Sequence, residues 1–324
     1  MHMSDALVST PVALTGVAIA AGLLATGGKE IKQRDNTSII PLMGVLGAFV
    51  FAAQMINFAI PGTGSSGHVI GGVLLAAFLG PWAAFITLAS VLIIQCLVFA
   101  DGGLLALGCN LINMGAMTTL VAYPFVYKPI VGKSVNPWRI TLGAVLACTV
   151  GLELGAVLVT FETMLSGVSA LSWQSFLSIM CLIHLPIGIA EGLATAAVLA
   201  FVAKTRPDLL IYENRTKLSR KTIGRAVLWF AVATVVIAGV VVWFASSEPD
   251  GLEWSIANLA GVEELEQEHP TVVSIIAGNI SNSTSIMADY ENPLSGIAGS
   301  VIVLVLVWCI SSMIIKRKKK HVEN

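Results

Sequence analysis

The chain has 324 residues, of which 56% are hydrophobic and 11% are charged, and its formal net charge is -1. A soluble domain carries about 25% charged residues, so this chain has too few polar groups to face water on all sides. Its mean hydropathy of +0.86 indicates a protein that lies in a lipid bilayer. The small net charge gives no bulk electrostatic attraction to nucleic acid.

Apolar segments of helical length recur along the chain. About 20 apolar residues cross the hydrocarbon core as a helix, and the period-two alternation of a spanning strand barrel is absent. We therefore predict an all-α integral membrane protein, a polytopic bundle of about nine transmembrane helices. The third segment is short and follows the loop PGTGSSG, which is typical of a helix that begins at membrane depth. The predicted segments are 6–26, 38–60, 68–80, 82–100, 103–125, 139–162, 173–203, 226–245 and 294–315.

Basic residues cluster at 29–34, 128–139, 204–225 and 316–320. Lys and Arg favour the cytoplasmic side of a membrane, and alternating the predicted spans places all these clusters on one side. The N-terminus is then predicted to lie outside and the C-terminus in the cytoplasm. The loop 246–293 falls outside, and it is rich in acidic residues and contains no Lys or Arg. It is either a plain solvated loop or a surface that attracts cations.

The polar stretch 206–225 joins two parts of different composition. We place a boundary there, with a first part at 1–210 and a second part at 211–324 that has two spans and the external loop. The five cysteines form no C-x-x-C pair and sit mostly in apolar runs. We predict that they are small apolar fillers and not metal ligands.

The chain begins Met1-His2. A free terminal amine, the deprotonated amide nitrogen of His2 and its imidazole Nδ1 can reach one metal and close two small rings in a plane. Square-planar nitrogen coordination suits Ni(II) and Cu(II), and a second imidazole would fill the fourth position. The segment MHMSDALVS lacks the basic n-region of a signal peptide, so we expect Met1 to keep its free amine. The alternative is a frayed terminus without a function.

His68 is the candidate for the fourth nitrogen among the five histidines of the chain. It follows a Gly- and Ser-rich loop, where the main chain can approach a ligand closely, and it opens the short third segment on the predicted outer side. An ionisable residue at membrane depth indicates a functional site. The alternative is a loop histidine that only makes hydrogen bonds.

Other polar side chains occur within or beside the apolar segments. Asn57, Asn110, Asn113 and Gln54 either make hydrogen bonds between helices or support His68 from the second shell around the metal.

Glu153, His184 and Glu191 are ionisable residues inside spans, and the last two share one helical face because they are seven residues apart. These three either stabilise packing or serve ion passage.

Five ordered motifs occur in the first part: MHMSDALVS (1–9), QMINFAIPGTGSSGHVIGG (54–72), LGPWAAF (79–85), DGGLLALGCNLINMG (101–115) and HLPIGIAEGLATAAVLAFV (184–202). Together they resemble the CbiM/NikM family, the substrate-binding membrane components of cobalt and nickel energy-coupling factor transporters. The resemblance covers about residues 1–210. The segment EPDGLEW at 248–254, between two spans, resembles the PDGLE/CbiN-like small component, here fused to the first part.

The resemblance implies a metal held by the terminal amine, the amide and imidazole of the second residue, and a loop histidine. These positions correspond to Met1, His2 and His68, and the chain departs from the family at Met3-Ser4-Asp5. The implied substrate is Ni²⁺ or Co²⁺, with no resident cofactor. The implied partners are a transmembrane coupling subunit and two cytoplasmic ATPase subunits, in the plasma membrane of a prokaryote.

The resemblance also implies a transporter subunit and not an enzyme. Gly132-Lys133-Ser134 is similar to the end of a phosphate-binding loop, but Tyr127 stands where that motif needs Gly, and no strand precedes it. We therefore expect ATP to bind to partner subunits and not to this chain.

Two rival functions remain open from the sequence. A secondary transporter would use Glu153, His184 and Glu191 as a proton relay, and a membrane metalloenzyme would need an open coordination position with a general base. No HExxH motif supports the enzyme. Nickel and cobalt both accept nitrogen ligands, and the sequence does not separate them.

Overall fold

The computed structural model describes residues 1–33, 39–132, 136–168, 171–210, 219–263, 265, 270–288 and 293–322. Some predicted features lie outside the described residues. These are Arg34, Lys133 and Ser134, the beginning of the predicted second part (211–218), the side chains of the basic cluster 316–320, and part of the acidic loop (264, 266–269 and 289–292).

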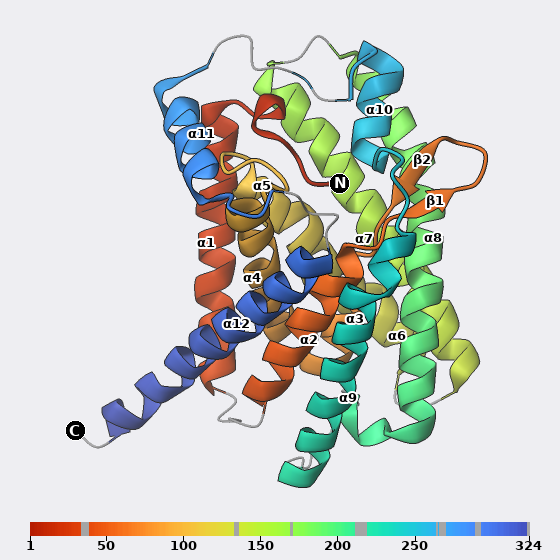
Figure 1. Ribbon diagram of the computed structural model, residues 1–324, viewed down its shortest axis with the longest axis vertical. Coiled ribbons are helices and arrows are strands. Elements are labelled where there is room, and N and C mark those ends of the chain that lie inside the picture. The colour runs from red at the N-terminus through yellow and green to blue at the C-terminus, as the bar shows by residue number, and fades with distance from the viewer. Residues whose placement is uncertain are drawn as a thin grey trace.

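The fold is a helical bundle with one small antiparallel hairpin of strands (Figure 1). The hairpin pairs Phe58 with Gly67 and Ile60 with Ser65. The elements in chain order are η1 (Asp5–Leu7), α1 (Thr10–Gln33), α2 (Ile39–Gln54), β1 (Phe58–Ile60), β2 (Ser65–Gly67), α3 (Gly72–Leu79), α4 (Pro81–Phe99), α5 (Leu107–Asn110), η2 (Leu111–Tyr127, a π-helix), α6 (Lys128–Val131), α7 (Pro137–Ser166), α8 (Trp173–Thr205), η3 (Pro207–Leu209), α9 (Arg220–Gly239), η4 (Val241–Phe244), α10 (Gly251–Ala260), α11 (Val272–Thr284) and α12 (Pro293–Val322).

Within the described residues, 6 helices are long and apolar enough to cross a membrane: α1, α4, α7, α8, α9 and α12. Each predicted segment contains a helix, so the prediction of a helical membrane bundle is confirmed. The predicted segment 38–60 was wrong at its end, because α2 stops at Gln54 and residues 58–60 form strand β1, which pairs with β2. Helix α2 is shorter, with 16 residues, and α3 has 8. Both are apolar and buried almost all round, as expected for helices enclosed by other helices. The count of about nine crossings stays a prediction.

The third predicted segment begins later than its apolar pattern indicated. We expected His68 to open the helix, but α3 begins at Gly72. The chain at 65–67 is instead paired with β1. Gly71, the N-cap of α3, has a φ of +77°, a left-handed conformation that glycine adopts at little cost. His68 therefore lies on an irregular connection between the hairpin and α3.

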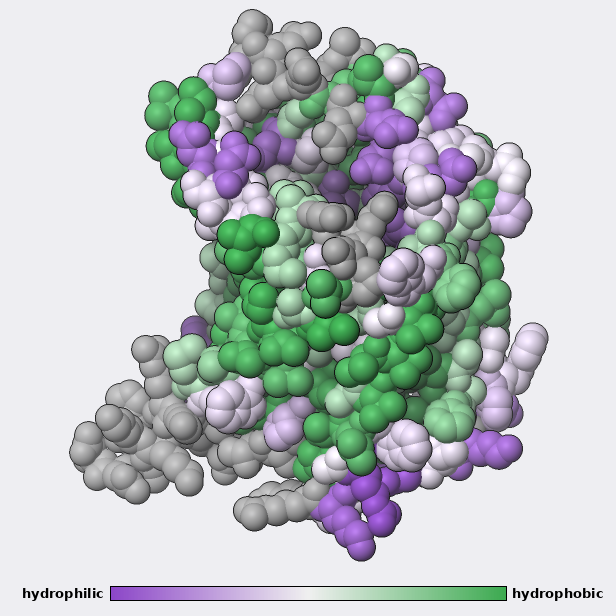
Figure 2. All heavy atoms as spheres, in the orientation of Figure 1, coloured by the Kyte–Doolittle hydropathy of each residue, from purple (hydrophilic) through white to green (hydrophobic). Residues whose placement is uncertain are grey.

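The surface is divided along the long axis of the molecule. Figure 2 shows hydrophobic side chains in a broad band between two hydrophilic ends, as expected for a protein that crosses a bilayer. At the lower end of Figure 1, α1 and α8 finish and α9 begins. These helix ends carry Lys32, Lys204 and Lys221, so basic residues of three separate segments share one end. Which end faces the cytoplasm stays a prediction.

The helices of the second part pack directly on the first part. Both α9 and α12 contact α2, and glycines allow the close approach. A Cβ added to Gly299 of α12 would lie 2.2 Å from the Phe51 ring, and one added to Gly47 of α2 would lie 3.3 Å from Val303. The two parts therefore form one continuous bundle.

The substitution Gly299→Ala is expected to lower the thermal stability of the purified protein. The new methyl group would collide with Phe51, which is fully buried and contacts Phe99 at a ring-centroid distance of 5.3 Å. Overpacking of this kind costs about 1–3 kcal/mol. Gly224→Ala on α9 is the matched control, because a Cβ there meets nothing within 4 Å. Equal unfolding temperatures for the two variants in detergent would contradict this packing.

Candidate metal centre

The N-terminal segment enters the bundle and does not extend into solvent (Figure 1). Met1 is 4% exposed and Met3 is 0% exposed. The main chain of Met3 is held on both sides: its N–H donates to Asn110 Oδ1 at 2.9 Å, and its carbonyl accepts from Asn110 Nδ2 at 3.1 Å and from Gly103 N at 2.9 Å. One asparagine side chain thus binds the segment as a neighbouring strand would.

Two more contacts hold the segment around Met3. Asn113 Nδ2 lies 3.6 Å from the sulfur of Met3 and donates to Glu162 Oε2 at 2.6 Å. Asp5 Oδ1 accepts from the N–H groups of Leu105 and Ala106 at 2.8 and 3.1 Å. The predicted side chains Asn110 and Asn113 therefore contact Met3, the residue that follows the proposed chelate.

The glycine pair after Asp101 lets this segment lie against the 101–106 loop. A Cβ added to Gly103 would lie 1.9 Å from Asp5 Oδ1 and 2.4 Å from the Asp5 amide nitrogen. Gly102 has a φ of +85°, and a Cβ there would lie 3.2 Å from that of His2. The DGG motif thus provides the close approach that the N-terminal segment needs.

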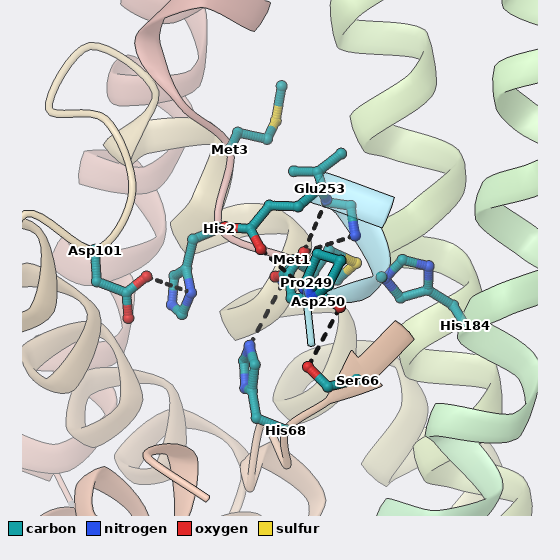
Figure 3. Close-up of polar contacts among 12 residues, drawn as sticks. Met1, His2, Met3, Ser66, His68, Asp101, His184, Pro249, Asp250 and Glu253 are labelled. Atoms are coloured by element: carbon teal, nitrogen blue, oxygen red, sulfur yellow. Dashed lines mark hydrogen bonds and ion pairs between the residues drawn. The ribbon is translucent and has the colours of Figure 1, made fainter. Parts of the chain in front are cut away.

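The three predicted metal-binding residues lie together (Figure 3). The Met1 amine nitrogen is 3.5 Å from His68 Nε2. The rings of His2 and His68 stack, with centroids 5.3 Å apart and planes inclined by 12°. His68 Nδ1 lies 3.2 Å from the carbonyl of Val69. With its proton on Nδ1 and directed to that carbonyl, the ring presents the lone pair of Nε2 to the amine side.

His2 also faces a carboxylate that the sequence analysis did not single out. Its Nδ1 is 2.9 Å from Asp101 Oδ1, while its Nε2 is buried without a partner in the described part of the chain. Burial raises the pKa of Asp101, but His2, His68 and the Met1 amine together outweigh this effect and hold that pKa below its usual value. Chelation through Nδ1 requires the ring to turn about its Cβ–Cγ bond.

The Met1 amine forms an ion pair with Asp250 Oδ2. The other oxygen, Oδ1, caps α10 by accepting from the N–H groups of Leu252 and Glu253 at 2.7 and 2.9 Å. Burial raises the pKa of Asp250, but the Met1 ammonium and His68 outweigh it, so this pKa lies well below the usual range. Asp250 is therefore a carboxylate that supports a helix and a charged amine at once.

The segment that carries Asp250 lies against the loop before His68. Ser66 N donates to Pro249 O at 2.8 Å, and Ser66 Oγ donates to Glu248 O at 2.7 Å. Trp254 Nε1 donates to Thr63 O at 2.9 Å. These bonds join the 246–293 loop of the second part to the hairpin of the first part.

The connection after His68 is supported from the interior of the bundle. Gln54 Nε2 donates to Ile70 O at 2.8 Å, and Gln95 Nε2 donates to Gln54 Oε1 at 2.8 Å. Glu191 Oε1 accepts from Gly71 N at 2.9 Å. Asn57, the remaining predicted amide, accepts through its main-chain oxygen from Ser246 N at 2.7 Å.

A small cavity of about 10 Å³ lies beside the Met1 amine, with room for one water-sized sphere. His184 lines it, and its Nδ1 is directed to Met180 O at 2.8 Å. Glu153 contacts Cys181 of α8 instead. The cavity is lined by Met1, Gly67, His68, Ile70, Leu152, His184, Ile187, Asp250 and Gly251.

No group of three or more His, Cys, Asp or Glu side chains in the described ranges is arranged to hold a metal ion. A metal at the N-terminus would use two main-chain nitrogens, the amine of Met1 and the amide of His2, together with two imidazoles. Such a set contains two side-chain donors, so it differs in kind from a site built from side chains alone.

The bundle and the nitrogen-rich cluster at one of its ends define a multi-pass membrane protein with a candidate cation site. Residues 2–209 match the family described as the cobalt uptake substrate-specific transmembrane region, CbiM, and residues 224–316 match the PDGLE domain. The chain belongs to the CbiM family and carries a C-terminal PDGLE domain.

Its relatives include a fused protein that it matches over most of the length of both chains. A putative fused nickel transport protein NikMN from Archaeoglobus fulgidus is 32% identical over 308 residues, which cover 94% of this chain and 96% of that protein. A cobalt transport protein CbiM from Geobacter sulfurreducens is 28% identical over 74% of this chain and 72% of that protein. A crystal structure of a truncated transition metal transporter is similar over 63% of this chain and 99% of that one, with 29% identity and a TM-score of 0.56. The protein is thus a prokaryotic membrane protein.

Three carboxylates of the site were missed by sequence reasoning. Asp101 and Asp250 lie inside motifs that carry the family resemblance, DGGLLALG and PDGLE, so their presence in these motifs was the available signal. Glu162 gave no signal, because it stands alone near the end of a long apolar helix.

Asn110→Ala is expected to loosen the N-terminal segment. Both main-chain groups of Met3 would lose their bonds to this side chain, and each such bond contributes about 0.5–1.5 kcal/mol. Hydrogen exchange at the Met3 amide should therefore become about tenfold faster or more. Asn258→Ala on α10, whose exposed side chain bonds its own helix at Trp254 O, is the control. Unchanged exchange at Met3 in the Asn110 variant would contradict this docking.

Proposed function

We propose that this chain is the substrate-binding component of an ATP-driven importer of Ni²⁺ or Co²⁺. In this proposal the metal is held by the Met1 amine, the amide and imidazole of His2, and the His68 imidazole. The observation that carries it is the meeting of the terminal amine with His68 Nε2 at 3.5 Å, beside the stacked His2 ring. The names of the fused relatives, which are nickel transport proteins, support the same substrate class.

The charges around the proposed site favour a cation. Asp101 and Asp250 lie against His2 and the Met1 amine. A divalent ion bound by one deprotonated amide and three neutral nitrogens keeps one net positive charge, and buried charge is stable only when it is compensated. Four planar nitrogens favour nickel over zinc, although copper ranks higher in general affinity. The choice between nickel and cobalt stays open.

The proposed transport cycle uses the position of the site near one end of the bundle. The metal is captured from outside and enclosed between the N-terminal segment and the 61–68 loop. It is then released inward, and ATP hydrolysis in partner subunits drives this release. The partners are a transmembrane coupling subunit and two ATPase subunits, and the chain itself is no enzyme.

The test of the site is the nickel content of the purified chain with a native N-terminus. His2→Ala, His68→Ala and a form extended before Met1 are each expected to lose nearly all bound Ni²⁺, because each removes a donor or the chelate spacing. His321→Ala, at the other end of the sequence, is the matched control and should bind as the native chain does. If all forms retain equal nickel, the site is refuted.

The energy source separates this proposal from the rival secondary transporter. Nickel uptake into cells that express the chain with its ATPase partners is expected to stop when the ATPase active site is inactivated, and to survive an uncoupler while ATP is maintained. Glu153→Gln should leave uptake intact in the same cells. Uptake by the chain without ATPase subunits that collapses with an uncoupler would favour the rival.

A further inference from the structure

The two oxygens of Asp250 have different partners. Oδ1 accepts the two N–H bonds that cap α10, and the Glu253 side chain completes this capping box by accepting from Asp250 N at 2.8 Å. Oδ2 contributes nothing to that helix and faces the Met1 amine. A helix cap needs one oxygen acceptor, so capping alone does not account for the second contact.

We propose that Asp250 is the carboxylate partner of the metal-binding amine, so that the PDGLE segment of the second part completes the metal site of the first part. This inference rests on the proposed function. Asp250 is a positioning residue and not a ligand. As the metal binds, the ammonium releases one proton to solvent and directs its lone pair to the metal. One of its two remaining N–H bonds then donates to Asp250 Oδ2.

The fold restricts the movement of this carboxylate. Residues on both sides of Asp250 are bonded to the hairpin. Glu248 O accepts from Ser66 Oγ, and Trp254 Nε1 donates to Thr63 O. Gly251 lies close against His184, since a Cβ added there would meet that ring at 3.0 Å. The Asp250 side chain is 16% exposed. The hairpin on one side and the His184 ring on the other therefore hold the carboxylate at the amine. Residues that orient metal ligands are usually held in place by contacts of this kind.

Asp101 contacts the His2 ring through Nδ1, the nitrogen that the chelate requires, so this contact is exchanged for the metal when the ring turns. The amine differs, because Asp250 can remain its partner while the metal is bound. Loss of such a partner commonly costs about 10- to 100-fold in metal affinity.

The test is Asp250→Asn in the full-length chain, with Ni²⁺ alone as the probe. Asparagine caps helices about as well as aspartate, so Oδ1 keeps its two bonds while the group facing the amine becomes an NH₂ donor. We expect the Kd for Ni²⁺ to rise about 10- to 100-fold. Glu248→Gln is the matched control, because it removes the same charge from the same loop at an exposed side chain, and its Kd should equal that of the native chain.

Two further readouts separate positioning from a structural effect. The d–d circular dichroism band per bound nickel reports the geometry of the chelate, and it is expected to change in Asp250→Asn but not in Glu248→Gln. The unfolding temperature of the metal-free Asp250→Asn protein is expected to fall, because the buried Met1 amine loses its opposite charge, and this readout measures the structural effect. A band and a Kd equal to those of the native chain would overturn the role of Asp250 while leaving the nitrogen site intact. An unaltered band with a lowered unfolding temperature would also overturn it. Absence of nickel binding by the native chain would instead refute the proposed function.

Discussion

The amine of Met1 carries a charge, and the residue is 4% exposed. A buried charge is stable when an opposite charge or several polar groups stand beside it. Here Asp250 provides the opposite charge and His68 the nearest ring nitrogen. Asp250 and His68 come from different parts of the sequence, so this single requirement brings the 246–293 loop, the hairpin and the first residues together.

The same need for polar partners explains the surroundings of the site. A peptide segment that enters a membrane bundle must have its N–H and C=O groups satisfied by protein. Asn110 does this for Met3, and Gln54 and Glu191 do it for the turn after His68. These residues are polar because they replace the water that the main chain would otherwise bind.

Local sequence pattern predicted much of the fold. The segment 82–100 corresponds to α4 (Pro81–Phe99) because Gly80 and Pro81 mark its start and an uninterrupted apolar run fills its length. The pattern did not predict the π-helix Leu111–Tyr127, since hydropathy does not report how backbone bonds are paired. The late start of α3 was also missed, because the pairing of the hairpin depends on contacts between strands.

For the site, Met1, His2 and His68 were predicted from a chelate geometry that needs only the order of residues at the start of the chain, together with a family resemblance. Asp101 and Asp250 were not predicted. Asp101 reaches His2 only because the 101–106 loop folds back on the N-terminal segment, and Asp250 reaches the Met1 amine only because of how α9 and α12 are packed. The hydropathy pattern along the chain does not indicate that Asp250 lies beside Met1. Such contacts depend on the packing of α9 and α12 against α2.

The covalent joining of the two parts has a consequence for how strongly they need to interact. The PDGLE segment is tethered by its own spans, so its meeting with the first residues is intramolecular, and a tether of this kind supplies an effective concentration in the millimolar range. The ion pair between Asp250 and Met1 and a few main-chain hydrogen bonds then suffice to keep the segment bound to the first part. Two separate chains joined by the same few bonds would instead have to meet by diffusion in the bilayer.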